Sequence, residues 1–204
     1  MHALPPLDES TAGTDPLKLF LTWFEAAFRA GGPEPAAMTL ATTGADGAPS
    51  ARMVLLKGCD ERGFVFFTNY ESRKGAELAA NPRAALVFYW PEMDRQVRVT
   101  GMVAKVSDAE SDEYFQSRPA GSRLAAAVSA QSETVGSRAE LEQKYVALSA
   151  KYPDGGVPRP KNWGGYCVQP DEIEFWHSRD NRLHDRIRFR RRAEGSWLVE
   201  RLAP

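Results

Sequence analysis

The sequence predicts a single domain that is mainly β-sheet with peripheral α-helices. Short β-prone runs separated by turn sequences begin at Ala37 and return near the C-terminus, whereas helical spacing is confined to a few segments between them. Several of the runs carry apolar residues on both faces, which is typical of a barrel wall packed against helices or a second subunit. A chain of 204 residues can bury such a core without disulfides or structural metal.

The N-terminal part divides into a tail and a helix. Residues 1–14 are rich in Pro, Ser, Thr and small residues without apolar periodicity, so we expect a mobile tail, with residues 15–204 forming the domain. Asp15 can cap a helix that begins at Pro16, and Gly31-Gly32 ends it. Apolar residues recur between them at helical spacing: Leu17, Phe20, Leu21, Phe24, Ala27 and Phe28.

The central part is predicted to form strands and one short helix. The β-prone runs AMTLATT, SARMVLLK, GFVFFTN, RAALVFYW and RQVRVTGMVAKV lie at residues 37–43, 50–57, 63–69, 83–90 and 95–106. Asp46-Gly47 is a hairpin signal between the first two, and we expect a small helix from Ser72 to Asn81.

The C-terminal part begins with helices and returns to strands. Ser107 with Glu110 and Ser137 with Glu140 are capping-box patterns, and Pro119 breaks the first of these two helices. After a Pro-rich linker, the runs YCVQP, EIEFWHS, RIRFRR and SWLVERL predict further strands at residues 166–170, 172–178, 186–191 and 196–202.

Composition excludes several classes of protein. A formal net charge of -1 argues against a surface built for nucleic acid or anionic lipid, and no apolar stretch approaches the roughly 20 residues needed to span a bilayer. We therefore expect a cytoplasmic protein without nucleic-acid or membrane partners. Cys59 and Cys167 stand alone in the sequence, so we expect no metal site.

Clustered cations mark the first candidate anion sites. Arg73 and Lys74 open the predicted helix after Ser72, where the helix dipole disfavours cations, and a phosphate bound there would remove the conflict. The alternative is two solvated cations. Arg52 and Lys57 flank the apolar run MVLL and could equally be solvated strand ends.

Two further clusters lie towards the C-terminus. Tyr114 and Arg118 share a helix face, with Ser122 just beyond the break, and together they could grip a phosphate. If the segment after Trp176 is extended, Arg182, His184 and Arg186 project from one face towards an anion. The alternatives are a surface arginine and a solvated strand edge.

The chain also resembles pyridoxine/pyridoxamine 5′-phosphate oxidases over residues 15–204. The resemblance is carried by RMVLLK, TNYESRKG, NPRAAL, RQVRVTG, YFQSRP, SAQS, WGGY, IEFW, RLHDR and the terminal ERLAP, in that order along the sequence. It implies an FMN-binding split β-barrel homodimer with two flavins in clefts at the subunit interface.

The resemblance also implies the site residues. The positions that match FMN-contacting motifs are Arg52, Met53, Val54, Leu55, Leu56, Lys57, Phe67, Thr68, Arg73, Lys74, Gln96, Gln131, Ser132, Trp176 and Arg186. Those that match the substrate site are Lys57, Tyr114, Arg118, Ser122, Arg182 and His184, with Arg182 and His184 in the catalytic role. Residues 1–14 contain no Arg, Lys or Tyr to fold over the substrate, so we expect their deletion to leave activity nearly unchanged.

The reaction implied is oxidation of pyridoxine or pyridoxamine 5′-phosphate to pyridoxal 5′-phosphate, with O2 as electron acceptor, H2O2 as product and ammonia released from the amine. Two alternatives stay open. One is a related split-barrel flavoenzyme of the phenazine-biosynthesis type, and the other is a noncatalytic protein that binds FMN or pyridoxal phosphate.

Overall fold

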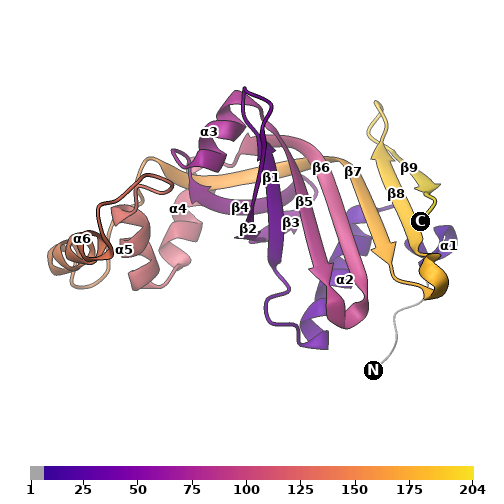
Figure 1. The fold of residues 1–204 in the computed structure, drawn as a ribbon, viewed down its shortest axis with the longest axis horizontal. Helices are drawn as coiled ribbons and strands as arrows, with labels where there is room; N and C mark the ends of the chain where they lie inside the picture. The colour runs from indigo at the N-terminus through magenta and orange to yellow at the C-terminus, as the bar shows by residue number, and fades with distance from the viewer. Residues whose placement is uncertain (1–6) are drawn as a thin grey trace.

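The computed structural model describes residues 7–204, and most of its strands belong to one curled sheet (Figure 1). Within that range nine strands pair in the order β2-β1-β5-β6-β7-β4-β3, with β8 on β7 and β9 on β8. All pairs are antiparallel. The strands are β1 Ala37–Thr43, β2 Pro49–Leu55, β3 Gly58–Asp60, β4 Gly63–Asn69, β5 Arg83–Trp90, β6 Arg95–Lys105, β7 Trp163–His177, β8 Asp185–Arg191 and β9 Trp197–Arg201.

Strand β7 divides the sheet into two parts. Its first residues, Trp163 to Val168, pair with β4, whereas Glu172 to His177 pair with β8 on the same edge. Strand β6 follows β7 on its other edge and shifts register between Thr100 and Gly101. A Cβ at Gly101 would lie 1.9 Å from the carbonyl oxygen of Gln169, so this bulge requires glycine. The strands predicted at residues 166–170 and 172–178 are both parts of β7, which is one long strand.

The predicted helices form where their caps lie. Helix α2, Pro16–Ala30, is capped by the Asp15 carboxylate and ends at Gly31 in the left-handed conformation. Ser72 caps α3, Arg73–Ala80, and Ser107 caps α4, Asp108–Ser117. Ser137 caps α6, Arg138–Lys151. Helices α1, Glu9–Ala12, and α5, Ala120–Val128, were not expected.

The main core lies between α2 and the inner face of the sheet. Phe20 is fully buried against Phe64 and Phe88, with ring centroids 4.8 and 4.9 Å away. A smaller cluster around Phe115, Leu124 and Trp163 joins α4, α5 and α6 to the start of β7. Figure 1 shows this helical lobe at one end of the sheet and the β8–β9 hairpin at the other.

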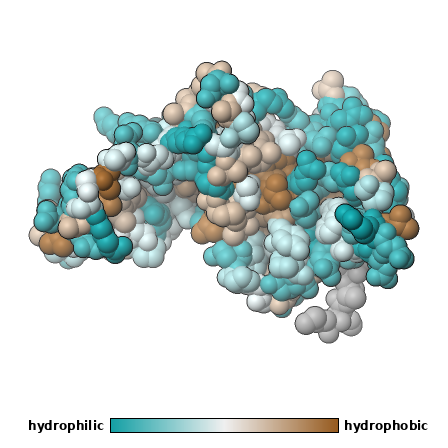
Figure 2. Space-filling model, viewed as in Figure 1, coloured by the Kyte–Doolittle hydropathy of each residue, from teal (hydrophilic) through white to brown (hydrophobic). Residues whose placement is uncertain are grey.

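The outer face of the sheet is uncovered along β2, β1 and β5. The registers place Met53 beside Thr39 and Thr39 beside Val87, and Ala41 lies between Ala51 and Ala85. Met53 is 61% exposed and Tyr89 is 58% exposed. Tan and brown atoms mark apolar residues in the middle of this view of the surface (Figure 2). Sequence analysis predicted this second apolar face, and no part of residues 7–204 covers it in a single copy of the chain.

The N-terminal segment departs from the expected tail. Residues 1–6 lie outside the described residues, but Leu7 and Ala12 are buried in the main core and α1 packs on β9. Asp8 caps α1 by accepting from the backbone N–H groups of Ser10 and Thr11. Composition did not indicate this ordered segment, because Leu7 and Ala12 are the buried apolar residues among its described positions. No described helix is long and apolar enough to cross a membrane.

Candidate functional site

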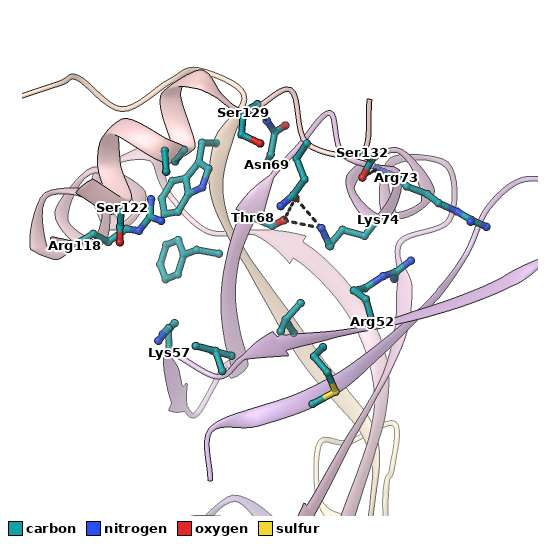
Figure 3. A pocket seen from close by; sticks show the side chains of 18 of the residues that line it. Arg52, Lys57, Thr68, Asn69, Arg73, Lys74, Arg118, Ser122, Ser129 and Ser132 are labelled. Atoms are coloured by element: carbon teal, nitrogen blue, oxygen red, sulfur yellow. Dashed lines mark hydrogen bonds between the residues drawn. The ribbon is translucent and has the colours of Figure 1, made fainter. Parts of the chain in front are cut away.

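A cleft of about 970 Å³ opens between β2, β4, the start of α3 and the α4–α5 junction (Figure 3). Trp163 of β7 also lines it, as do Ser129, Gln131 and Ser132, and the Ser132 hydroxyl accepts from the backbone N–H of Arg73 at the N-terminus of α3. The sequence-predicted residues that line the cleft are Arg52, Met53, Val54, Leu55, Lys57, Phe67, Thr68, Arg73, Lys74, Tyr114, Arg118, Ser122, Gln131 and Ser132. Leu56 instead is buried in the core.

A buried carboxylate holds two of the cations at one end of the cleft. Glu77 Oε1 accepts from Arg73 Nε at 2.8 Å, and Glu77 Oε2 lies 3.2 Å from Arg52 Nη2. Thr42 and Ser50 donate to the same Oε2 at 2.5 and 2.6 Å. Arg52 also donates to both hydroxyls. Glu77 thus fixes the guanidinium groups of β2 and α3 relative to each other.

The pKa of Glu77 reflects these contacts. Burial acts to raise it, but hydrogen bonds from Ser50, Thr42, Arg73 and Arg52 outweigh burial and lower the pKa from 4.5 to about 2. Because the folded-state pKa is depressed, the carboxylate stabilises the fold above pH 4.5, and this contribution is lost as the pH falls towards 2.

We expect Glu77→Gln to reduce the free energy of unfolding at pH 7 and to differ progressively less from the wild type between pH 4.5 and 2. The amide carries no charge to be protonated, so the pH-dependent part of this interaction is absent from the variant. Urea unfolding at a series of pH values measures it. Glu142→Gln, which removes an exposed partner of Arg138, is the control, with an expected difference below about 0.5 kcal/mol. A constant gap between wild type and Glu77→Gln would contradict the assignment.

Lys74 lies at the floor of the cleft with only 8% of its surface exposed. Its Nζ donates to Gln131 Oε1 at 2.8 Å and to Thr68 Oγ1 at 3.2 Å (Figure 3). It also donates to Ser72 Oγ at 3.3 Å. Burial lowers the pKa of Lys74, Arg52 lowers it further, and Glu77 opposes both. Such a group gains from a bound anion, because a negative charge would offset the cost of burial.

The other end of the cleft is aromatic. Tyr114 stacks on Phe67 with ring centroids 4.0 Å apart, and the Arg118 guanidinium lies 4.8 Å from the Trp163 ring centroid. Among the described residues, buried Nη1 of Arg118 finds no hydrogen-bond partner, and burial lowers the pKa of this arginine. Arg123 donates to the Arg118 carbonyl oxygen at 2.8 Å and so fixes the backbone there. A guanidinium that lines a cleft and still has hydrogen-bonding capacity is suited to an anionic ligand.

A second group of predicted residues lies outside this cleft, on the uncovered face of the sheet. The registers align Gln96 of β6, Trp176 of β7 and Arg186 of β8 in one row. Arg186 is held by buried Glu174 at 2.8 Å and by the Ala203 carbonyl oxygen at 2.8 Å. The His184 ring centroid lies 4.7 Å from that of Trp176.

The segment that carries Arg182 is not extended, which corrects the expected single face. Residues Asp180–Arg182 form a 3-10 turn, and Asn181 and Arg182 have φ angles of 57° and 63°. Two consecutive left-handed residues reverse the chain before β8 begins at Asp185. Arg182 therefore lies on a turn, His184 directly precedes β8, and Arg186 is the second residue of β8.

Sequence reasoning missed two residues that shape the cleft. Glu77 orients Arg52 and Arg73, and its position four residues after Arg73 on a helix was the available signal. Trp163 forms the wall behind Arg118, and it lies in the WGGY motif, which was noted without assigning the tryptophan a role.

The sequence of this chain matches known families and relatives. Residues 24–152 match the sequence family described as "Pyridoxamine 5′-phosphate oxidase", and residues 163–204 match the "Pyridoxine 5′-phosphate oxidase C-terminal dimerisation region". A pyridoxine/pyridoxamine 5′-phosphate oxidase from Cupriavidus pinatubonensis is 57% identical over 203 residues, which cover 100% of this chain and 95% of the relative.

Two solved structures share the fold. PhzG from Burkholderia lata 383, crystallised with tetrahydrophenazine-1-carboxylic acid, is 30% identical with a TM-score of 0.92, covering 99% of this chain and 100% of that one. A pyridoxamine 5′-phosphate oxidase-related, FMN binding protein from Nostoc punctiforme has a TM-score of 0.73 at 17% identity, covering 94% of this chain and 100% of its own. The second likeness concerns the fold alone.

Proposed function

The chain belongs to the pyridoxamine 5′-phosphate oxidase family, and from that premise we propose that it oxidises pyridoxine 5′-phosphate or pyridoxamine 5′-phosphate to pyridoxal 5′-phosphate. It is a homodimeric flavin oxidoreductase with FMN as its cofactor and a small molecule as its substrate. The alcohol and O2 would give the aldehyde and H2O2. The amine would consume a water as well and release ammonia. Dioxygen as acceptor and a cytoplasmic location are parts of the same proposal.

The observation that carries the proposal is Arg118, a cleft-lining arginine whose buried Nη1 has no hydrogen-bond partner among the described residues. The same cleft also offers the hydroxyl groups of Tyr114 and Ser122 and the ammonium of Lys57. These four groups suit a phosphate monoester, which presents several strong acceptor oxygens and close to two negative charges. We assign them to the substrate phosphate.

The opposite end of the cleft suits the phosphate of FMN. Arg52, Arg73 and Lys74 supply three cations, and Ser132 lies close enough to accept from the Arg73 N–H at 3.2 Å. Buried Lys74 and the N-terminus of α3 both favour an anion at this place. Gln131, Thr68 and the backbone of residues 52–57 would hold the rest of the mononucleotide.

We infer that a second copy completes each site. Gln96, Trp176 and Arg186 do not line the cleft of their own chain, yet they lie on the same uncovered sheet face as Met53 and Leu55. Packing two such faces together would cover the apolar strands and present this row to the partner's cleft. The dimerisation region at residues 163–204, which carries Trp176 and Arg186, supports this arrangement.

The chemistry would then depend on a few donors. Bound FMN would supply the acceptor for the hydride that leaves the substrate's C4′ carbon. His184 Nδ1 accepts the backbone N–H of Arg179 at 3.1 Å, so its neutral ring carries the proton on Nε2 and presents a donor. Arg182 adds a permanent positive charge beside it. We assign both to orienting the substrate ring and to polarising the reacting group, while the phosphate contacts hold the far end.

The second candidate reaction is the phenazine-biosynthesis type, favoured by the close structural match to PhzG. A tricyclic acid has no phosphate monoester for Arg118 to bind, whereas the aromatic wall of Phe67, Tyr114 and Trp163 would accept either ring system. Arg118 would also pair with a carboxylate, so the vitamin phosphate is favoured by the further donors of the same cleft, Lys57, Tyr114 and Ser122, which match the several oxygens of a phosphate monoester.

We expect FMN-loaded protein in air-saturated buffer to form one H2O2 per pyridoxal 5′-phosphate when pyridoxine 5′-phosphate is added. If the protein forms peroxide with a reduced phenazine carboxylate but not with pyridoxine 5′-phosphate, the second candidate reaction is the correct one. A protein that keeps FMN and oxidises neither compound would be a noncatalytic binding protein.

We also expect the purified protein to be yellow and to release FMN on heating. Arg52, Arg73 and Lys74 form one cluster for a mononucleotide phosphate, and the cations at the other end of the cleft are assigned to the substrate, so FAD should bind poorly. Chromatography of the released flavin tests whether this site selects FMN. Finding only FAD, or no flavin after reconstitution with FMN, would contradict it.

A further inference from the structure

The turn that carries Arg182 depends on its surroundings for its conformation. Asn181 and Arg182 are both left-handed, and such residues other than glycine cost free energy unless neighbouring contacts hold them. Arg182 and Leu183 are exposed, and Leu183 shows 70% of its surface. The turn is thus not held by burial in the core.

A chain of ion pairs ties this turn to the N-terminal helix. Arg179 Nε lies 2.6 Å from Asp185 Oδ2, which closes the turn between the residues on either side of it. Asp185 Oδ1 accepts from Arg201 Nη1 at 3.0 Å. Arg201 in turn grips Glu9 with two parallel bonds, from Nε at 3.0 Å and from Nη2 at 2.8 Å.

Helix α1 is a fixed anchor for this chain of contacts. Leu7 is 3% exposed and Ala12 is 4% exposed, so both ends of the helix are buried in the main core. The Asp8 cap fixes the first turn, which includes Glu9. Figure 1 shows α1 beside β9 and the C-terminus, behind the turn that leads into β8.

We propose that Glu9 and Arg201 are positioning residues that hold the 179–185 turn, and with it Arg182 and His184, in the conformation used for the reaction. An isolated surface ion pair contributes little, but a two-pronged arginine bond within a linked series of charges has the geometry that does contribute. The assignment of Arg182 and His184 to the reaction rests on the proposed function. The N-terminal segment would thus support the site from behind without entering it, and deleting residues 1–14 would not be neutral.

The test compares Glu9→Gln with Glu142→Gln in the FMN-loaded dimer. Both remove an exposed carboxylate that pairs with an arginine, but only Glu9 is linked to the turn. We expect Glu9→Gln to speed amide hydrogen exchange of residues 179–185 about 3- to 10-fold. We expect kcat with pyridoxine 5′-phosphate to fall by a similar factor, with KM and the FMN dissociation constant within about twofold of the wild type.

A double-mutant cycle isolates the link. Glu9→Gln combined with Arg201→Gln should be no worse than Arg201→Gln alone, because the glutamate acts only through the arginine. Additive losses, unchanged exchange in the turn, or faster exchange with an unchanged kcat would each overturn the proposal. If the wild type does not oxidise the vitamin phosphates, the proposed function fails, while the exchange measurement still decides whether Glu9 holds the turn.

Discussion

Replacing Arg118 with methionine is expected to raise KM for pyridoxine 5′-phosphate roughly 10- to 150-fold while changing kcat much less. Arg118 lines the cleft, its buried Nη1 has no hydrogen-bond partner among the described residues, and loss of one charge-assisted hydrogen bond to a phosphate costs about 1.5–3 kcal/mol. The phosphate lies far from the carbon that loses the hydride. Its binding energy is therefore largely the same in the ground state and the transition state, and its loss appears in KM.

Arg182→Met provides the contrast. We expect it to depress kcat more than KM, because Arg182 is assigned to the reacting end of the substrate. Steady-state kinetics on both flavin-saturated variants separates the two roles. The FMN content of Arg118→Met should match the wild type, since Arg118 lies at the aromatic end of the cleft, away from the Arg73 and Lys74 cluster. If both variants changed only KM, and equally, the division of roles would be wrong.

The local structure was largely predictable because it depends on neighbouring residues. Helix α2 begins at Pro16 after the Asp15 cap and ends at Gly31, as the pattern indicates. Strand β5 occupies the predicted residues 83–90, with Leu86 and Phe88 inside and Tyr89 outside. The caps at Ser107 and Ser137 also start their helices. In each case the signal and the structure it specifies lie within a few residues of each other.

The turn at Asp180–Arg182 was not predictable in the same way. Asparagine adopts the left-handed conformation more often than most residues, but arginine does not, so the sequence does not indicate two consecutive left-handed residues at Asn181 and Arg182. The turn ends at Asp185, which pairs with Arg201, and Arg201 pairs with Glu9 at the other end of the chain. Helix α1 has the same explanation, because Leu7 and Ala12 are fixed by a core that forms from distant strands.

The candidate site shows the same division. The clusters at residues 72–74 and 114–122 were visible as local runs of cations and hydroxyls, and the structure brings both into one cleft with Arg52 and Lys57. That Gln96, Trp176 and Arg186 form a separate row could not be read from the residues, because it depends on strand register across β6, β7 and β8. The family resemblance identified these residues as FMN-binding positions but did not indicate whether they contact FMN in their own chain's cleft or in the partner's.

Ala41→Glu is expected to raise the dimer dissociation constant more than about 100-fold and to release FMN as the protomers part. Ala41 lies on the uncovered sheet face, between Ala51 and Ala85, where two small neighbours leave room for a closely packed partner. A glutamate there would be buried in the proposed interface beside two alanines that cannot pair with it, and an unpaired buried charge costs several kcal/mol. Because a two-fold interface uses the same surface of both subunits, each dimer would carry the substitution twice.

The matched control is Ala147→Glu, the same substitution on the exposed surface of α6. Ala147 lies away from the uncovered sheet face, so we expect this variant to remain dimeric and yellow. Sedimentation velocity over a range of concentrations, followed at the flavin absorbance, measures assembly and FMN retention together. Circular dichroism should show that the Ala41→Glu protomer keeps its secondary structure, because in one protomer this face is not part of the main core. A flavin-loaded dimer of Ala41→Glu at the concentrations where the wild type dimerises would place the interface elsewhere, and the row of Gln96, Trp176 and Arg186 would then need another role.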